Sequence, residues 1–179
     1  MGKMPLMGAH IRCIPPGYLK GDVHSFACEL IDKEYDVAEG LHAYMEVIWA
    51  MHEIARETAT WKEPNWNEIP NIPIDNIEDI NSLVRSVTAN ISPMMFFVNS
   101  TPSPLLGECN KKPKEINDAL LKCLEEAKDY HISDINEYPN PREIEFRLDA
   151  ILVKATQLFD TYLVDQFDTA QRILDDILG

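Results

Sequence analysis

The stretch from Asn140 to Leu178 constrains the fold more than any other part of the chain. Asn140 suits a helix N-cap, Pro141 suits the first helical position, and Glu143 follows in the first turn. Apolar residues then recur at steps of three and four, with no further Gly or Pro: Ile144, Leu148, Ile151, Leu152, Ala155, Leu158, Phe159, Tyr162, Leu163, Phe167, Ala170, Ile173, Leu174 and Ile177. At 1.5 Å per residue this helix would be roughly 50 Å long. We therefore predict one long helix over about 141–178, against which shorter helices pack.

Several other stretches have the same helical period. Capping boxes predict one helix over 36–60 and another from Asp75 to a point before Pro93. Pro113 opens a further amphipathic helix, and 22–33 has a short apolar stripe of the same kind. Together these patterns predict an all-α protein with four to five helices.

The length of 179 residues, of which 45% are hydrophobic, suits one domain with a substantial core. We therefore expect a single α-helical domain over 1–179, in which the Pro- and Gly-rich segment 1–21 is irregular. The apolar run 94–98 fits either a turn of helix or a strand.

The apolar arc of the long C-terminal helix is wide, which predicts contacts with helices on two of its sides. Gln166 falls near the middle of this arc. In a bundle core its amide would need hydrogen-bond partners, whereas at an oligomer seam it could fix the register. A homodimer through the C-terminal helix is therefore one hypothesis.

The formal net charge of −14 restricts the partners of this chain. Nucleic acids and anionic membrane surfaces carry the same sign of charge, so we expect no direct binding to either. A basic protein is the natural complement, although a high negative charge also serves solubility. The chain has no signal-peptide pattern and no apolar run of roughly 18 residues, so we expect a cytoplasmic protein.

One group of residues could bind a metal ion. Glu39 and His42 lie one helical turn apart, and Glu46 and Glu53 continue nearly the same helix face. Di-iron carboxylate bundles use a Glu-x-x-His pair on each of two helices, but this chain has only one. The alternative interpretation is an ordinary solvated helix face with charged pairs four residues apart.

Nucleotide pyrophosphohydrolases of the all-α class bind magnesium through a Glu-x-x-Glu and a later Glu-x-x-Asp. The chain has no Glu-x-x-Glu, but three Glu-x-x-Asp matches supply the second half: Glu126 with Asp129, Glu115 with Asp118, and Glu29 with Asp32. His52 lies at the flank of an apolar stripe, where a histidine hydrogen-bonded at the edge of the core is expected. The four cysteines show no zinc-ligand spacing.

Two sets of residues are candidates for binding a protein partner. Trp61 and Trp66 lie on a connection stiffened by Pro64, and they could be interface anchors or could fold back over the core. Acidic residues recur on the outward side of the long helix and could face a basic partner or only solvent: Asp165, Asp168, Asp175 and Asp176.

Our first hypothesis is therefore an acidic cytosolic protein-binding module without catalysis or a cofactor, such as an inhibitor, an immunity-type protein or an adaptor. The alternative is a helical-bundle enzyme that uses a divalent metal ion, of the di-metal carboxylate or pyrophosphohydrolase-like kind.

Overall fold

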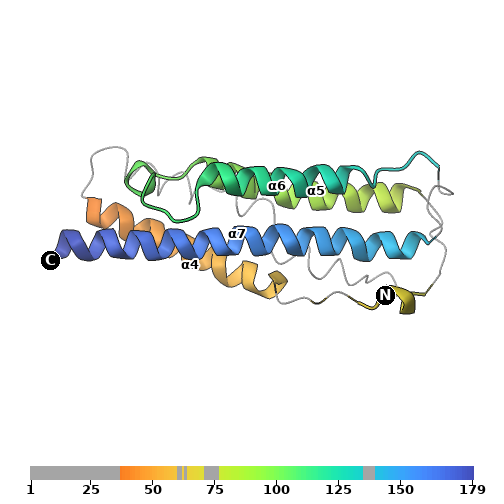
Figure 1. The fold of residues 1–179 in the computed structure, drawn as a ribbon, viewed down its shortest axis with the longest axis horizontal. Helices are drawn as coiled ribbons and strands as arrows, with labels where there is room; N and C mark the ends of the chain where they lie inside the picture. The colour runs from red at the N-terminus through yellow and green to blue at the C-terminus, as the bar shows by residue number, and fades with distance from the viewer. Residues whose placement is uncertain (1–36, 60–61, 63, 71–76, 135–139) are drawn as a thin grey trace.

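The computed structural model describes residues 37–59, 62, 64–70, 77–134 and 140–179. In this part of the chain there are four α-helices, two short 3₁₀ turns and no β-strand, so the all-α prediction is confirmed (Figure 1). The elements are α4 (Val37–Ala59), η1 (Trp66–Glu68), α5 (Ile77–Asn99), η2 (Ser103–Leu105), α6 (Pro113–Lys128) and α7 (Pro141–Leu178). The predictions for 1–21, 22–33 and Trp61 lie outside the described residues.

Helix α7 forms the spine of the bundle and has the predicted bounds. The Asn140 side chain accepts a hydrogen bond from the Arg142 backbone N–H at 3.2 Å, which satisfies one free donor of the first turn. At the other end the Gly179 N–H donates to the Asp175 carbonyl at 3.0 Å. Helix α7 contacts α4, α5 and α6. In Figure 1 α5 and α6 lie along one side of α7, whereas α4 crosses it obliquely, so the wide apolar arc packs against helices from more than one direction, as predicted.

Helix α5 shows that the predicted end before Pro93 was wrong. The helix continues through Pro93 to Asn99, and the undecided run 94–98 is helical. Proline inside a helix costs about 3 kcal/mol. Met94, Phe97 and Val98 are all fully buried beyond it, and each contributes about 1.5–3 kcal/mol by leaving water. Their burial therefore outweighs the cost of the proline.

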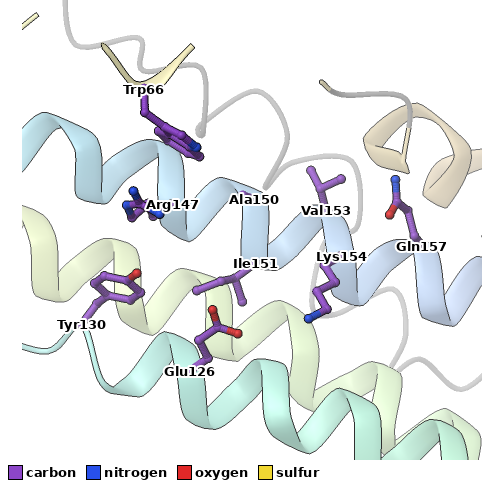
Figure 2. Close-up of a pocket in the computed structure, with 9 residues that line it drawn as sticks. All are labelled: Trp66, Glu126, Tyr130, Arg147, Ala150, Ile151, Val153, Lys154 and Gln157. Carbon is purple, nitrogen blue, oxygen red and sulfur yellow. The ribbon is translucent and has the colours of Figure 1, made fainter. Parts of the chain in front are cut away.

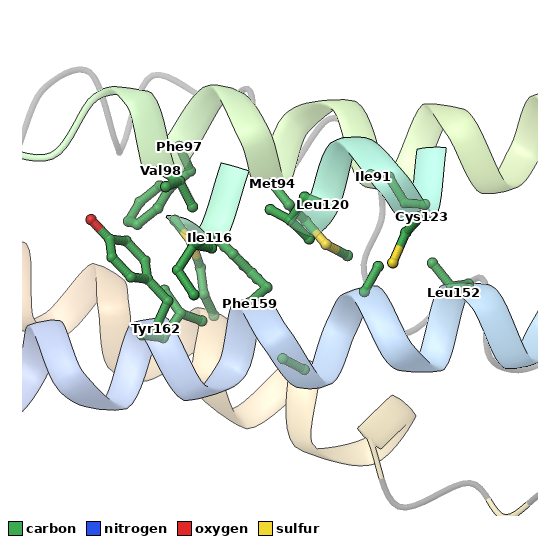
Figure 3. Close-up of a cluster of buried hydrophobic side chains, with 14 of the residues drawn as sticks. Ile91, Met94, Phe97, Val98, Ile116, Leu120, Cys123, Leu152, Phe159 and Tyr162 are labelled. Carbon is green, nitrogen blue, oxygen red and sulfur yellow. The ribbon is translucent and has the colours of Figure 1, made fainter. Parts of the chain in front are cut away.

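The core lies where α5 and α6 face α7, and Figure 3 shows their side chains meeting between the ribbons. The Phe97 ring stands edge-on to Phe159, with centroids 5.7 Å apart. On its other side Phe97 stacks on Tyr44 of α4 at 6.0 Å. Cys123 is buried with this group, and burial raises the pKa of its thiol. All four helices thus share one apolar core.

Gln166 lies in the core, where its amide is satisfied within the chain. It donates to the Tyr162 hydroxyl at 3.1 Å and to the Thr101 hydroxyl at 3.0 Å, and it accepts from the Tyr44 hydroxyl at 3.4 Å. Burial raises the pKa of Tyr162 to about 12. Because these bonds already explain Gln166, it gives no support to a dimer seam, and the homodimer stays a prediction.

Two side chains fix the connections on the α5 and α6 side. Asn81 forms two 3.0 Å hydrogen bonds to the backbone of Ile132, one to its N–H and one to its carbonyl, which hold the turn after α6 against α5. Asp165 accepts a 2.8 Å bond from the Lys111 N–H, which ties the connection before α6 to α7. Gly107 allows that connection to turn, with a φ of 83°. Within the described residues, no helix is both long and apolar enough to span a bilayer.

Candidate functional site

A groove follows the seam between α4 and the C-terminal part of α7. Its walls are Ala38 to Trp49 on α4 and Phe167 to Leu178 on α7, and we call it the α4/α7 groove. Two adjoining cavities, with volumes of about 660 and about 420 Å³, make up the groove. Because α4 runs antiparallel to this part of α7, Trp49 lies opposite Phe167 at one end and Ala38 lies near Leu178 at the other.

Trp49 is the largest side chain of the groove and is 50% exposed. Its ring packs on Phe167 with centroids 5.5 Å apart and planes tilted by 49°. Its indole N–H donates to the Glu53 carboxylate at 3.0 Å, which fixes the orientation of the ring. A large aromatic side chain is therefore held in place while half of its surface remains in contact with water.

His52 supports the Trp49 ring from the α4/α7 seam. The two rings lie 5.4 Å apart, and the His52 Nδ1 atom is 2.5 Å from the Asp160 carboxylate of α7. Both side chains are mostly buried, so the prediction of a hydrogen-bonded histidine at the edge of the core is confirmed. A His–Asp pair can also orient a catalytic base. Among the described residues, however, no hydroxyl or thiol is hydrogen-bonded to His52.

The ionisable residues of the groove are mainly acidic. Glu39 and Glu46 line it and are exposed, and the Glu46 carboxylate lies 3.7 Å from the His42 Nδ1 atom. No lysine or arginine occurs among the described residues that line the two cavities. The groove therefore combines an apolar floor with carboxylates on its α4 wall.

The candidate metal ligands Glu39, His42 and Glu46 belong to this groove, whereas the Glu53 carboxylate accepts the Trp49 indole N–H. Glu126 lies on α6, across α7 from α4. In the part of the chain that the structure describes, no group of three or more His, Cys, Asp or Glu side chains is placed to bind a metal ion. The metal site stays an untested prediction.

Trp66 covers a separate pocket of about 440 Å³ between η1, α6 and α7. Figure 2 shows its ring above Arg147, whose guanidinium carbon lies 4.5 Å from the ring centroid. Trp66 is partly buried by this contact, so it folds back onto the bundle. Lys154 and Glu126 also line this pocket, which thus offers charges of both signs and selects for neither an acidic nor a basic group.

The four acidic residues predicted on α7 have different environments. Asp165 binds the Lys111 N–H and serves the fold, while Asp168 and Asp176 are exposed. Asp175 is exposed and accepts a 2.9 Å bond from the Gln171 amide, whose side chain lines the groove. Asp168 and Asp175 are two turns apart and follow the groove residues Phe167 and Leu174, so they border its α7 wall on the solvent side.

Asp149 is another acidic residue of α7, and its side chain is fully buried. Burial raises the pKa of this carboxyl from 3.8 to about 7, because the charged form loses its water. Asp149 does not line either cavity of the groove. Its effect is therefore expected on stability.

No protein-family model, curated protein or solved structure matches this chain. Sequence reasoning missed Trp49, although a signal for it was present. In the helix predicted over 36–60, residues such as Leu41, Tyr44 and Ile48 form the apolar face, and the helical period places Trp49 at the border of that face.

Proposed function

We propose that the protein is a binding module without catalysis, an inhibitor, immunity-type protein or adaptor, and that it binds a basic partner protein in the α4/α7 groove. The observation that carries this proposal is the half-exposed Trp49 ring packed on Phe167 beside an apolar cavity of about 660 Å³. Tryptophan is one of the residue types enriched among the few side chains that contribute most of the binding energy of protein interfaces.

The fixed orientation of Trp49 supports this proposal. Side chains that become ordered only on binding lose about 0.5–1.5 kcal/mol each. The bond to Glu53 and the packing on His52 and Phe167 already hold the indole, so little of this cost remains. A partner that covered the ring would gain the burial of its exposed half.

Charge supports a basic partner. Glu39 and Glu46 line the groove, Asp168 and Asp175 border it, and the whole chain carries a net charge of −14. Opposite charge on a partner raises the rate of association and excludes acidic competitors. A cytoplasmic location remains the expectation drawn from the sequence.

The test compares two tryptophans with different environments. Full-length protein is used to capture partners from its source cells, and the captured protein is then purified and titrated against wild type, Trp49→Ala and Trp66→Ala. We expect Trp49→Ala to weaken the affinity by about tenfold or more, as for an interface hot spot. Trp66→Ala should leave the affinity unchanged. Equal affinities for wild type and Trp49→Ala would overturn the proposal.

A further inference from the structure

We infer that the element of the partner that enters the α4/α7 groove is a basic amphipathic helix with two apolar anchor residues one turn apart. This inference rests on the proposed function and specifies the partner of the same site. It follows from the length of the groove, the spacing of its two cavities and the position of its charges.

The groove has the length and direction expected for a docked helix. Its α4 wall runs from Ala38 to Trp49, which at 1.5 Å per residue is about 16 Å, or three helical turns. Both walls are helices, and apolar helices dock into such seams through residues on one face. An extended peptide would instead pair with a strand edge, and the described residues contain no strand.

The two cavities set the spacing of the anchors. On α4 the larger cavity is lined between His42 and Trp49, and the smaller between Ala38 and Glu46. On α4 the two sets of lining residues are offset by three to four positions, and on α7 by four to seven. An offset of four positions, about one turn or about 6 Å, is common to both walls. Apolar side chains at positions i and i+4 of a bound helix would therefore enter the two cavities. The larger anchor belongs beside Trp49 and Phe167.

Acidic residues border both walls and determine the flanks of the bound helix. Glu39 and Glu46 lie on the α4 wall, and Asp168 and Asp175 border the α7 wall. A helix whose apolar face enters the groove presents its flanking positions to these carboxylates. Lysine or arginine at those positions completes the charge pairing, whereas acidic residues there would be repelled.

Three synthetic peptides of equal length and apolar content probe this arrangement by fluorescence anisotropy with the full-length protein. The first is a lysine-rich helix with its apolar residues on one face. The second has the same composition with the apolar residues scrambled around the helix, and the third has glutamate in place of lysine. We expect saturable binding of the first peptide with a Kd on the order of 10 μM, and at least about tenfold weaker binding of the other two.

Matched variants locate the binding. Trp49→Ala should weaken the affinity for the first peptide by about tenfold. Leu178→Ala tests the smaller cavity in the same way, by its effect on the affinity for the first peptide. Leu178 ends α7 and is 70% exposed, so it can be truncated without disturbing the core. Glu46→Lys should weaken binding about fivefold at low salt, whereas Glu125→Lys, an equal charge change at an exposed site on α6, should have little effect.

The outcomes separate this inference from the proposed function. Equal binding of the ordered and scrambled peptides, or equal effects of Glu46→Lys and Glu125→Lys, would show attraction by net charge and overturn the inference. A homodimer would also overturn the inference if a second copy of the chain occupied the groove and the Trp49→Ala variant sedimented as a monomer. If no peptide binds while Trp49→Ala still prevents capture of the natural partner, the helix inference fails and the proposed function stands. If the natural partner is also insensitive to Trp49→Ala, both fail.

Discussion

Replacing Asp149 by asparagine should stabilise the protein in a way that depends on pH. The Asp149 carboxyl is fully buried in α7, and burial raises its pKa from 3.8 to about 7. Below about pH 4 the carboxyl is mostly protonated in both the folded and the unfolded chain, so its ionisation does not change the free energy of unfolding. Between pH 4 and pH 7 the unfolded chain loses this proton first, and stability falls as the pH rises. Above about pH 7 the cost is complete and constant.

The two pKa values set the size of the effect. A difference of about three units, at 1.36 kcal/mol per unit, corresponds to about 4 kcal/mol in the free energy of unfolding. Asparagine has nearly the shape of the protonated carboxyl and carries no charge, so Asp149→Asn should recover most of this at pH 8. For a chain of this length 1 kcal/mol shifts the melting temperature by about 2–4 °C, which gives an expected gain of about 10 °C.

The assay is a series of thermal melts from pH 4 to pH 8, followed by circular dichroism. Wild type and Asp149→Asn should melt together near pH 4 and separate progressively up to pH 7. Asp168→Asn removes one exposed carboxylate from the same helix and serves as the control for net charge. The reasoning would be refuted by a gap between Asp149→Asn and wild type that is the same at all pH values, or that is equally large for Asp168→Asn.

Three further predictions follow from the core and the groove. Asn81→Ala should lower the free energy of unfolding in urea by about 3 kcal/mol, because two buried backbone groups of Ile132 lose their partner; a change below about 1 kcal/mol would contradict this. Gln166→Leu should lower the free energy of unfolding by about 2 kcal/mol without changing the sedimentation coefficient, because the amide is hydrogen-bonded within the chain. A change of oligomeric state would restore the dimer-seam hypothesis. The melting temperature should change by less than about 1 °C on addition of EDTA or of millimolar Mg²⁺, Mn²⁺ or Fe²⁺, because only a ligand that binds the folded state raises it. A shift of several degrees that is lost in a His42→Ala, Glu46→Ala double variant would favour the metalloenzyme instead.

The bounds of α7 could be predicted because they depend on local chemistry. The Asn140 side chain accepts a hydrogen bond from the Arg142 N–H, and Pro141 occupies the first helical position, where no backbone N–H is needed. The apolar period then continues unbroken to Leu178. Each of these signals acts within one or two turns of helix. A single sequence contains all of the information that they require.

The continuation of α5 through Pro93 could not be predicted in the same way. The local rule ends a helix before proline, and the compensating energy comes from Met94, Phe97 and Val98 packing into the core. That burial depends on contacts such as the one with Phe159, which is 62 residues further along the chain. The periodicity of 94–98 alone leaves helix and strand equally acceptable.

The candidate site was only partly visible in the sequence. The acidic character of the groove walls follows from composition, and the sequence points to Glu39, His42 and Glu46, although as metal ligands. The groove itself depends on how α4 docks on α7, which places Trp49 against Phe167. Such a pairing between distant segments leaves no pattern in a single sequence.

The arrangement of the bundle predicts that the fold and the proposed binding site can be perturbed separately. Helices α5 and α6 pack along one side of α7, and α4 crosses α7 obliquely (Figure 1). Of the helices in the described part of the chain, α4 is the one that forms the groove with the C-terminal part of α7. The seam between two helices leaves a concave strip, and in a larger bundle a third helix fills it. Here Trp49 borders that strip, while the fully buried Leu41 and Ile48 of the same helix hold the core. Truncating Trp49 should therefore change the free energy of unfolding little and weaken partner binding strongly. Ile48→Ala should instead lower the free energy of unfolding by about 2–5 kcal/mol, because it opens a cavity in the core.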